Sequence, residues 1–174
     1  VMREYAGEII DGARIMAHAL GTPRVVVGIE ENKPQAIEIM TRAASAFASV
    51  EVVAVPVQYP MGSERHLVQA ITGLETPVRK LTADLGIVVH NVSTARAVHQ
   101  AVRFGRPLVA RVVTVSGGAI REPKNILAPI GARIADLVEF CGGFAARPES
   151  VVNGGPMMGQ PLASLDAPVV KGTS

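Results

Sequence analysis

Residues 24–37 read RVVVGIEENKPQAI, and this stretch decides the fold class. Residues 24–29 are rich in β-branched side chains, which suit a strand buried on both faces of a sheet. Asn32 follows as a candidate helix cap, with Pro34 in the first turn and Gln35 at the capping-box position. A buried strand that runs directly into a helix is typical of an α/β layer.

The segments on either side continue this alternation. Residues 8–20 form a predicted helix that stops at Gly21, with an apolar stripe made of Ile9, Ala13, Met16, Ala17 and Leu20. Residues 50–57 form a second Val-rich strand, and Ser63 is a plausible N-cap for a helix that ends near Gly73. The order is therefore helix, strand, helix, strand, helix.

A third strand and helix follow a polar stretch. Residues 86–89, GIVV, read as another buried strand, and Ser93 opens a helix that carries Val98, Ala101 and Val102 and ends at Gly105. Strands that alternate with helices favour a parallel or mixed sheet with helices on its faces. We therefore predict one α/β domain over residues 1–106.

The pattern changes at Pro107. Residues 108–115 form a strand, and a second extended piece reaches Ile130. A helix with Ile134, Leu137, Val138 and Cys141 follows and ends at Gly142-Gly143, and further strands are expected at residues 150–153 and 168–171. A hairpin, a helix and more strands are the order of a β-grasp module, which we assign to residues 107–174.

Composition excludes several classes of function. A net charge of +2 is too small to mark a nucleic-acid surface, and the apolar runs are far shorter than the roughly 20 residues of a membrane helix. The single cysteine, Cys141, rules out an internal disulfide, and alone it cannot hold a zinc ion or an iron–sulfur cluster. We predict no metal ligands and no catalytic residue. Val1 and the closing residues 171–174 suggest an excerpt from a longer chain.

The histidines carry no recognisable metal pattern. His18, His66 and His99 lie in predicted helices, and none has a second ligand at metal spacing. We interpret all three as surface or cap residues.

Two turns could contact a cofactor. No G-x-G-x-x-G motif occurs, and the two carboxylates of residues 28–32 would repel phosphate, so that turn is interpreted as a solvated helix start. In residues 59–66, YPMGSERH, Gly62 brings backbone N–H groups to a helix N-terminus, and Glu64 could accept from ribose or flavin hydroxyls. Residues 90–94, HNVST, lie where a parallel strand ends, the edge at which α/β sheets bind ligands. Ordinary helix capping is the simpler explanation of the turn at residues 59–66, and for residues 90–94 it remains an equal alternative.

A third stretch is rich in glycine. Residues 154–159, GGPMMG, combine three glycines with Met157 and Met158, which suit a soft apolar contact in a core or on a partner surface. The composition is also typical of a loop that ends a strand.

Six blocks of the sequence, in order, resemble the RnfC family. They are residues 28–37 (GIEENKPQAI), 59–62 (YPMG), 91–94 (NVST), 111–115 (RVVTV), 154–159 (GGPMMG) and 168–171 (PVVK). The resemblance runs nearly from end to end. The family is similar to the flavoprotein subunit of respiratory complex I, which implies a Rossmann-like FMN and NADH domain followed by a soluble-ligand-binding β-grasp (SLBB) domain.

The resemblance also implies cofactor-binding residues. The turns that contact flavin and nucleotide in the complex I relative correspond to residues 62–64 and 90–94, and a nucleotide-pocket lysine corresponds to Lys80. Residues 63, 90 and 93 depart from the relative's pattern, and the phenylalanine expected after Lys80 is missing. The implied cofactor-binding set is Gly62, Glu64, Lys80, Asn91 and Thr94.

The resemblance implies the NADH-side subunit of a membrane-bound Rnf electron-transport complex. Electrons would pass from NADH through FMN and 4Fe-4S clusters to a ferredoxin-like partner, or in reverse, coupled to ion translocation. The subunit would lie peripherally on the cytoplasmic side of the bacterial inner membrane, among the other Rnf subunits. The flavin loop and the two cluster motifs would lie outside residues 1–174, so this stretch alone would be inactive.

Two alternatives remain open at this stage. The chain could be a non-catalytic scaffold or docking module within the same complex, which the departures at Ser63 and His90 favour slightly. It could also belong to a related cobalamin reductase with the same two domains.

Overall fold

The computed structural model describes residues 1–155 and 158–173. The chain divides into two compact units, Val1–Pro107 and Leu108–Ser174, and each has its own hydrophobic core. Both units combine helices with small sheets, so the chain is a mixed α/β protein.

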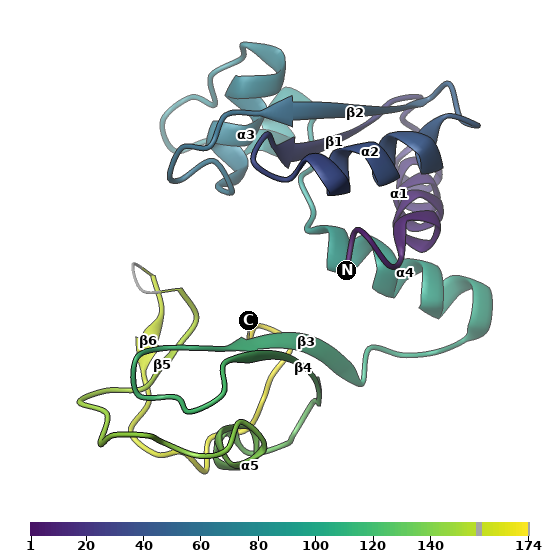
Figure 1. Ribbon diagram of the computed structural model, residues 1–174. Helices are drawn as coiled ribbons and strands as arrows, with labels where there is room; N and C mark the ends of the chain where they lie inside the picture. Colours follow the sequence, from purple (N-terminus) through teal and green to yellow (C-terminus); the bar gives the residue numbers. More distant parts are fainter. Residues whose placement is uncertain (156–157, 174) are drawn as a thin grey trace. The chain divides into compact units, whose positions relative to one another are not determined.

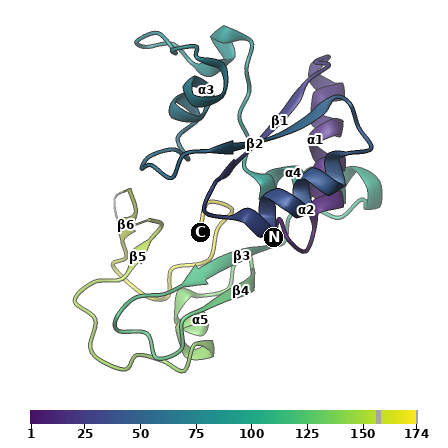
Figure 2. The ribbon, with the colours of Figure 1, turned by 45° about the horizontal axis from the view of Figure 1, so that its top comes forward.

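The first unit is built on two parallel strands. β1 (Val25–Glu30) pairs with β2 (Val50–Val55), with Val25 opposite Val50, and α2 (Pro34–Ala44) connects them. Figures 1 and 2 show α2 running alongside the two strands. The predicted strand–helix–strand unit is confirmed. Its turn is also solvated, because Lys33 Nζ pairs with Glu30 at 2.8 Å and Glu31 is exposed.

Three further α-helices belong to this unit: α1 (Ala6–Leu20), α3 (Glu64–Thr72) and α4 (Val92–Phe104). The predicted stops of α1 and α4 are confirmed, because Gly21 and Gly105 take the left-handed backbone with φ of 67° and 64°. Glycine adopts this conformation without the steric cost that a Cβ brings.

The core of the first unit gathers on one face of β1. Val27 and Ile29 are buried there with Ile9 of α1 and Met40 of α2. On the opposite face, a Cβ at Gly28 would touch the side chains of α3. The two strands therefore have helices on both faces.

Two local predictions in the first unit are wrong. Residues 86–89 do not form a strand: Thr82–Leu85 is a 3-10 helix (η1), and residues 87–90 have no regular structure. A strand needs a neighbour, and no described residue hydrogen-bonds this segment into a sheet. The N-cap of α2 is Lys33 rather than Asn32, so the expected capping box does not form.

The second unit is a hairpin covered by a helix. β3 (Ala110–Val115) pairs antiparallel with β4 (Lys124–Pro129), and Val112 lies opposite Leu127. α5 (Ile134–Phe140) packs along one face of the hairpin (Figures 1 and 2). The predicted burial of Ile134, Leu137, Val138 and Cys141 is confirmed.

The last strands of the second unit are shorter than predicted. Residues 150–153 contribute only β5 (Val152–Asn153), which pairs with β6 (Gln160–Pro161). The strand predicted at residues 168–171 reduces to one bridge between Arg133 and Pro168, because only two backbone hydrogen bonds, through Val169, extend it. The glycine-rich turn predicted at residues 154–159 includes Pro156 and Met157, which lie outside the described residues.

Candidate functional site

The first candidate turn lies at the start of α3. Ser63 is the N-cap, as predicted, but its side chain makes no capping hydrogen bond. The first helical bond at this end is Leu67 N–H to the Ser63 carbonyl, at 2.9 Å. The N–H groups of residues 64–66 therefore have no acceptor among the described residues. Gly62 and Glu64 are exposed beside them, so this turn offers backbone donors and one carboxylate acceptor.

Lys80 is tied to the same turn by a contact that sequence reasoning missed. Arg65 Nη2 donates to the Lys80 carbonyl at 2.7 Å. The Lys80 ammonium is exposed and lies 3.9 Å from Asp84 Oδ1. No spacing rule could have found a bond between residues 15 positions apart. Through it, the Lys80 backbone is tied to Arg65, the residue that follows Glu64.

The second candidate turn lies at the start of α4. Asn91 is the N-cap, and its side-chain oxygen accepts from Ser93 N–H at 2.8 Å, so the helix opens at Asn91 and not at Ser93. Thr94 N–H donates to the Asn91 carbonyl at 2.9 Å. These donors are already in use, which leaves the Asn91 amide nitrogen and the Thr94 hydroxyl for a ligand. Both residues are exposed.

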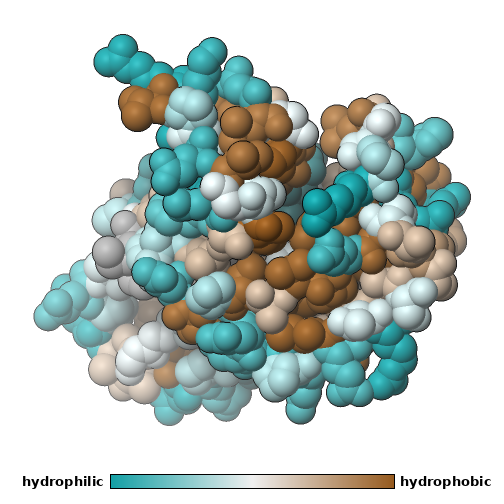
Figure 3. Space-filling view, turned by 90° about the horizontal axis from the view of Figure 1, so that it is seen from above, coloured by the Kyte–Doolittle hydropathy of each residue, from teal (hydrophilic) through white to brown (hydrophobic). Residues whose placement is uncertain are grey.

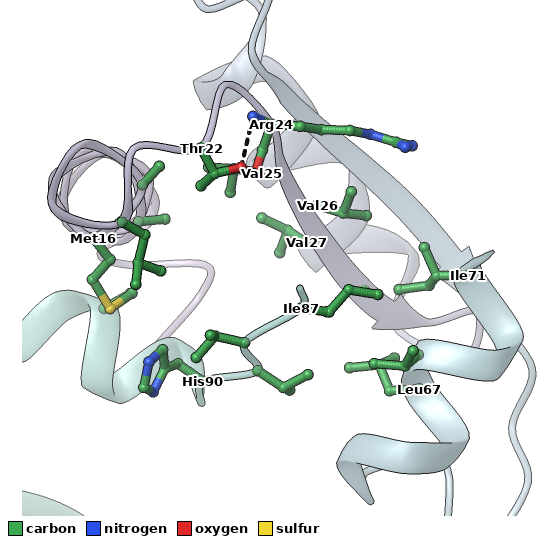
Figure 4. A pocket seen from close by; sticks show the side chains of 18 of the residues that line it. Met16, Thr22, Arg24, Val25, Val26, Val27, Leu67, Ile71, Ile87 and His90 are labelled. Atoms are coloured by element: carbon green, nitrogen blue, oxygen red, sulfur yellow. Dashed lines mark hydrogen bonds between the residues drawn. The ribbon is translucent and has the colours of Figure 1, made fainter. Parts of the chain in front are cut away.

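A cavity of about 590 Å³, which we call the β1 cavity, is lined by residues of both α3 and α4. Its walls are β1, one face of α1, α3 and residues 86–90, and Figure 4 shows side chains from all four pointing into one space. Hydrophobic side chains gather around a hollow on the face seen in Figure 3. None of the five predicted site residues lines the cavity, although His90 and Val92 on either side of Asn91 do.

The structure thus brings only part of the predicted set together. Lys80 joins the α3 turn, whereas no hydrogen bond or ion pair of the described residues joins the α3 turn to the α4 turn. Both turns remain open to solvent.

The chain that carries these turns matches known protein families. Residues 1–100 match the family described as the Nuo51 FMN-binding domain, and residues 112–161 match the SLBB domain. The C component of an ion-translocating oxidoreductase complex from Rhodobacter capsulatus is 57% identical over 100% of this chain. The chain belongs to the RnfC family.

Two further relatives support the assignment. The C component of the proton-translocating ferredoxin:NAD(+) oxidoreductase complex of Clostridium ljungdahlii is 46% identical over 99% of this chain. The C component of the ion-translocating oxidoreductase complex of Pseudomonas aeruginosa is 44% identical over 98% of it. The chain spans 34%, 38% and 22% of the lengths of these three relatives, in the order given.

One histidine of this RnfC chain differs from its predicted surface role. His99 is largely buried, and its Nδ1 lies 2.7 Å from Asp11 Oδ2. The packing of α1 against α4 brings these residues together across 88 positions of sequence. His18 and His66 are exposed, as predicted. Within residues 1–155 and 158–173, no three His, Cys, Asp or Glu side chains are grouped so that they could hold a metal ion.

The charged groups between α1 and α4 of this RnfC chain are structural. Hydrogen bonds from the Arg103 guanidinium, and a further one from His99, hold the pKa of Asp11 well below its usual range. Burial raises the pKa of Glu8, but hydrogen bonds from Gln100 and Arg96 outweigh it and leave that pKa lowered. These pairs join α1 to α4, and none of them involves the exposed turns at the starts of α3 and α4. No helix of the described chain is long and apolar enough to cross a membrane.

Proposed function

We propose that this chain is part of the NADH-side subunit of a membrane-bound, ion-translocating electron-transport complex. Residues 1–106 contribute to a Rossmann-like FMN and NADH domain, and residues 107–174 form a β-grasp SLBB domain. The match of residues 1–100 to the Nuo51 FMN-binding family is the observation that carries this proposal. The names of the relatives support the same complex.

The intact subunit would take electrons from NADH and pass them through FMN and 4Fe-4S clusters towards a ferredoxin-like partner, or in reverse. The clusters would be held by polypeptide outside residues 1–174. The subunit would lie peripherally on the cytoplasmic side of the bacterial inner membrane, with the other subunits of the complex. FMN, when bound, would accept hydride and release single electrons, and the protein would bind and orient the cofactor.

The α3 turn fits part of such a cofactor. Its three free backbone N–H groups at residues 64–66 suit a phosphate or another electron-rich group at a helix N-terminus. Glu64 would accept from a ribose or ribityl hydroxyl, and Gly62 would let the backbone approach closely. Lys80, held beside the turn by Arg65, would add a positive charge.

The α4 turn fits less completely. Its Ser93 and Thr94 N–H groups are already bonded to Asn91, so it offers side-chain contacts rather than backbone ones. In this proposal Asn91 and Thr94 orient the cofactor's polar edge, and neither transfers a proton.

Titration of the full-length subunit with FMN and with NADH tests the site. Glu64→Gln keeps the side-chain shape and removes its charge, so it should cost a charge-assisted hydrogen bond worth about 1.5–3 kcal/mol. The affinity of the subunit for FMN or for NADH should fall roughly ten- to a hundredfold. Glu75→Gln is the matched control, because Glu75 is exposed just past the other end of α3. Equal affinities for wild type and Glu64→Gln would remove Glu64 from the site.

A second candidate function is docking by the SLBB domain. On the face of the hairpin away from its core, Val112 and Leu127 form an exposed cross-strand pair, and Leu127 is 65% exposed. Phe140 of α5 is also exposed. Apolar side chains held in water favour a protein partner. Leu127→Glu should then reduce co-purification with the other subunits and leave flavin affinity unchanged. The relatives reported above give the cobalamin reductase alternative no comparable support.

A further inference from the structure

Residues 75–80, which we call the 75–80 loop, belong to no helix or strand and end in a strained turn. Lys80 N–H donates to the Pro77 carbonyl at 3.0 Å and closes the turn. Arg79 occupies its third position with φ of 64°, where glycine or asparagine is usual because a Cβ makes this conformation costly. Arg79 is exposed, so packing of its own side chain does not hold it there. Such a conformation persists only where neighbouring groups support it.

Helix α3 supplies this support through two side chains. Arg65 Nη2 donates to the Lys80 carbonyl at 2.7 Å, directly after the strained residue Arg79. Gln69 Nε2 donates to Glu75 Oε1 at 3.2 Å, at the other end of the loop. Residues 65 and 69 are one helical turn apart and lie on the same face of α3. The Arg65 bond is the stronger of the two, because its donor is charged and its distance is shorter.

Arg65 also belongs to the turn that we propose for the cofactor. Its backbone N–H is one of the three at residues 64–66 that have no acceptor among the described residues. The same residue therefore contributes its backbone to the cofactor turn and its side chain to the 75–80 loop. The position of the Lys80 backbone relative to the cofactor turn thus depends on the Arg65 side chain.

The ammonium group of Lys80 is available to an anion. It lies 3.9 Å from Asp84 Oδ1, and the Lys80 side chain is 61% exposed. An exposed pair at this distance contributes little to stability, so the ammonium can turn to a stronger partner such as a phosphate. Which phosphate it can reach is set by the place of its backbone, and therefore by Arg65.

We propose that Arg65 is a positioning residue of the cofactor site. Its guanidinium holds the 75–80 loop so that Lys80 can reach a phosphate bound at residues 64–66, and the guanidinium itself does not contact the ligand. This inference rests on the proposed function, because the phosphate is that of FMN or NADH. Arg65 then affects ligand affinity only through Lys80, whereas the loop depends on Arg65 with or without a ligand.

Limited digestion of the ligand-free full-length subunit with trypsin tests the effect of Arg65 on the loop. Arg65→Ala should speed cleavage after Arg79 or Lys80 roughly two- to tenfold, because losing one hydrogen bond raises the population of the open loop. Mass spectrometry identifies the cut positions and gives the rates. Arg42→Ala is the matched control, because Arg42 is also an exposed arginine but bonds to Glu38 within α2. Equal cleavage rates in Arg65→Ala and wild type would overturn the inference and leave the proposed function untouched.

A double-mutant cycle tests whether Arg65 acts through Lys80. In titrations of the full-length subunit, Lys80→Ala should weaken the binding of FMN or of NADH roughly tenfold. Arg65→Ala should weaken the same ligand by a similar factor in the wild type, but by less than about twofold when residue 80 is already Ala.

Two results of this cycle would overturn the inference. Losses that multiply in the double variant would mean that the Arg65 guanidinium contacts the ligand directly. Wild-type affinity of Lys80→Ala for both ligands would remove Lys80 from the proposed site, and the positioning role of Arg65 with it. Trypsin cleavage that is faster in Arg65→Ala together with this second result would locate the failure in the proposed cofactor site rather than in the bond to the loop.

Discussion

Gly12 of α1 lies directly against the backbone carbonyl of Ala95 in α4, with no room between them for a side chain. Ala95 is buried at this crossing. Around it, Arg96 bonds to Glu8 at 2.9 Å, and Arg103 bonds to both carboxylate oxygens of Asp11 at 2.8 Å. Because Gly12 has no side chain, α4 can approach α1 closely at this crossing. Asn91 caps the start of α4, so the crossing also fixes the position of the Asn91 turn.

Gly12→Ala should therefore destabilise the first unit. The added methyl group would overlap backbone that cannot rotate away, and overpacking of this kind costs about 1–3 kcal/mol or more. The free energy of unfolding in urea, followed with hydrogen exchange in α1 and α4, measures the loss. Gly7→Ala is the control in the same helix, because a Cβ there would touch nothing. It should be neutral or stabilising by up to about 1 kcal/mol. Equal losses in the two variants would disprove the close approach.

Asp11 should make stability depend on pH. Its folded pKa is lowered, chiefly by the hydrogen bonds from Arg103, so its contribution is present above the ordinary value of 3.8 and is lost as the pH falls towards the folded pKa. Asp11→Asn should lower the free energy of unfolding by roughly 1 kcal/mol at neutral pH, the upper range for solvent-accessible pairs.

The difference between wild type and Asp11→Asn should shrink below about pH 4, near the pKa of an unfolded Asp. Urea unfolding at a series of pH values measures it. Glu38→Gln is the control, because Glu38 and Arg42 form an exposed pair on α2. A difference that stays constant down to about pH 2 would be inconsistent with the Asp11 assignment.

Leu137→Ala should destabilise the second unit by about 2–5 kcal/mol. Leu137 is 5% exposed and packs in the core beneath the β3–β4 hairpin. Phe140→Ala removes a larger side chain from the same helix, yet Phe140 is 66% exposed, so its loss should stay below about 1 kcal/mol. Thermal unfolding compares the two. A larger loss of stability for Phe140→Ala than for Leu137→Ala would contradict this assignment, because it would mean that α5 packs on the hairpin through Phe140 rather than through Leu137.

Features set by a few neighbouring residues were predictable from sequence. The ends of α1 and α4 at Gly21 and Gly105, and the β1–α2–β2 unit, follow from backbone preference and β-branched runs. The N-cap of α2 was misplaced by one residue, from Lys33 to Asn32, because several polar residues there could begin the helix.

Features set by distant partners were not predictable. Residues 86–89 have the composition of a strand, but a strand forms only when a neighbour supplies hydrogen bonds. His99 looked like a surface residue, because its partner Asp11 is 88 positions away. The bond from Arg65 to the Lys80 carbonyl was missed for the same reason. Of the candidate site, helix capping at the two turns could be foreseen, whereas the choice of Asn91 over Ser93 as the cap and the surroundings of Glu64 could not.

Cys141 is the only cysteine of the sequence, and it is fully buried at the end of α5. A thiol reagent can reach its sulfur only when the second unit opens, because no native surface exposes it. The labelling rate of this one atom therefore reports the opening of the SLBB unit alone, without a signal from residues 1–107. A mutation, a ligand or a partner protein that acts on that unit can thus be detected by mass spectrometry in an otherwise unmodified protein.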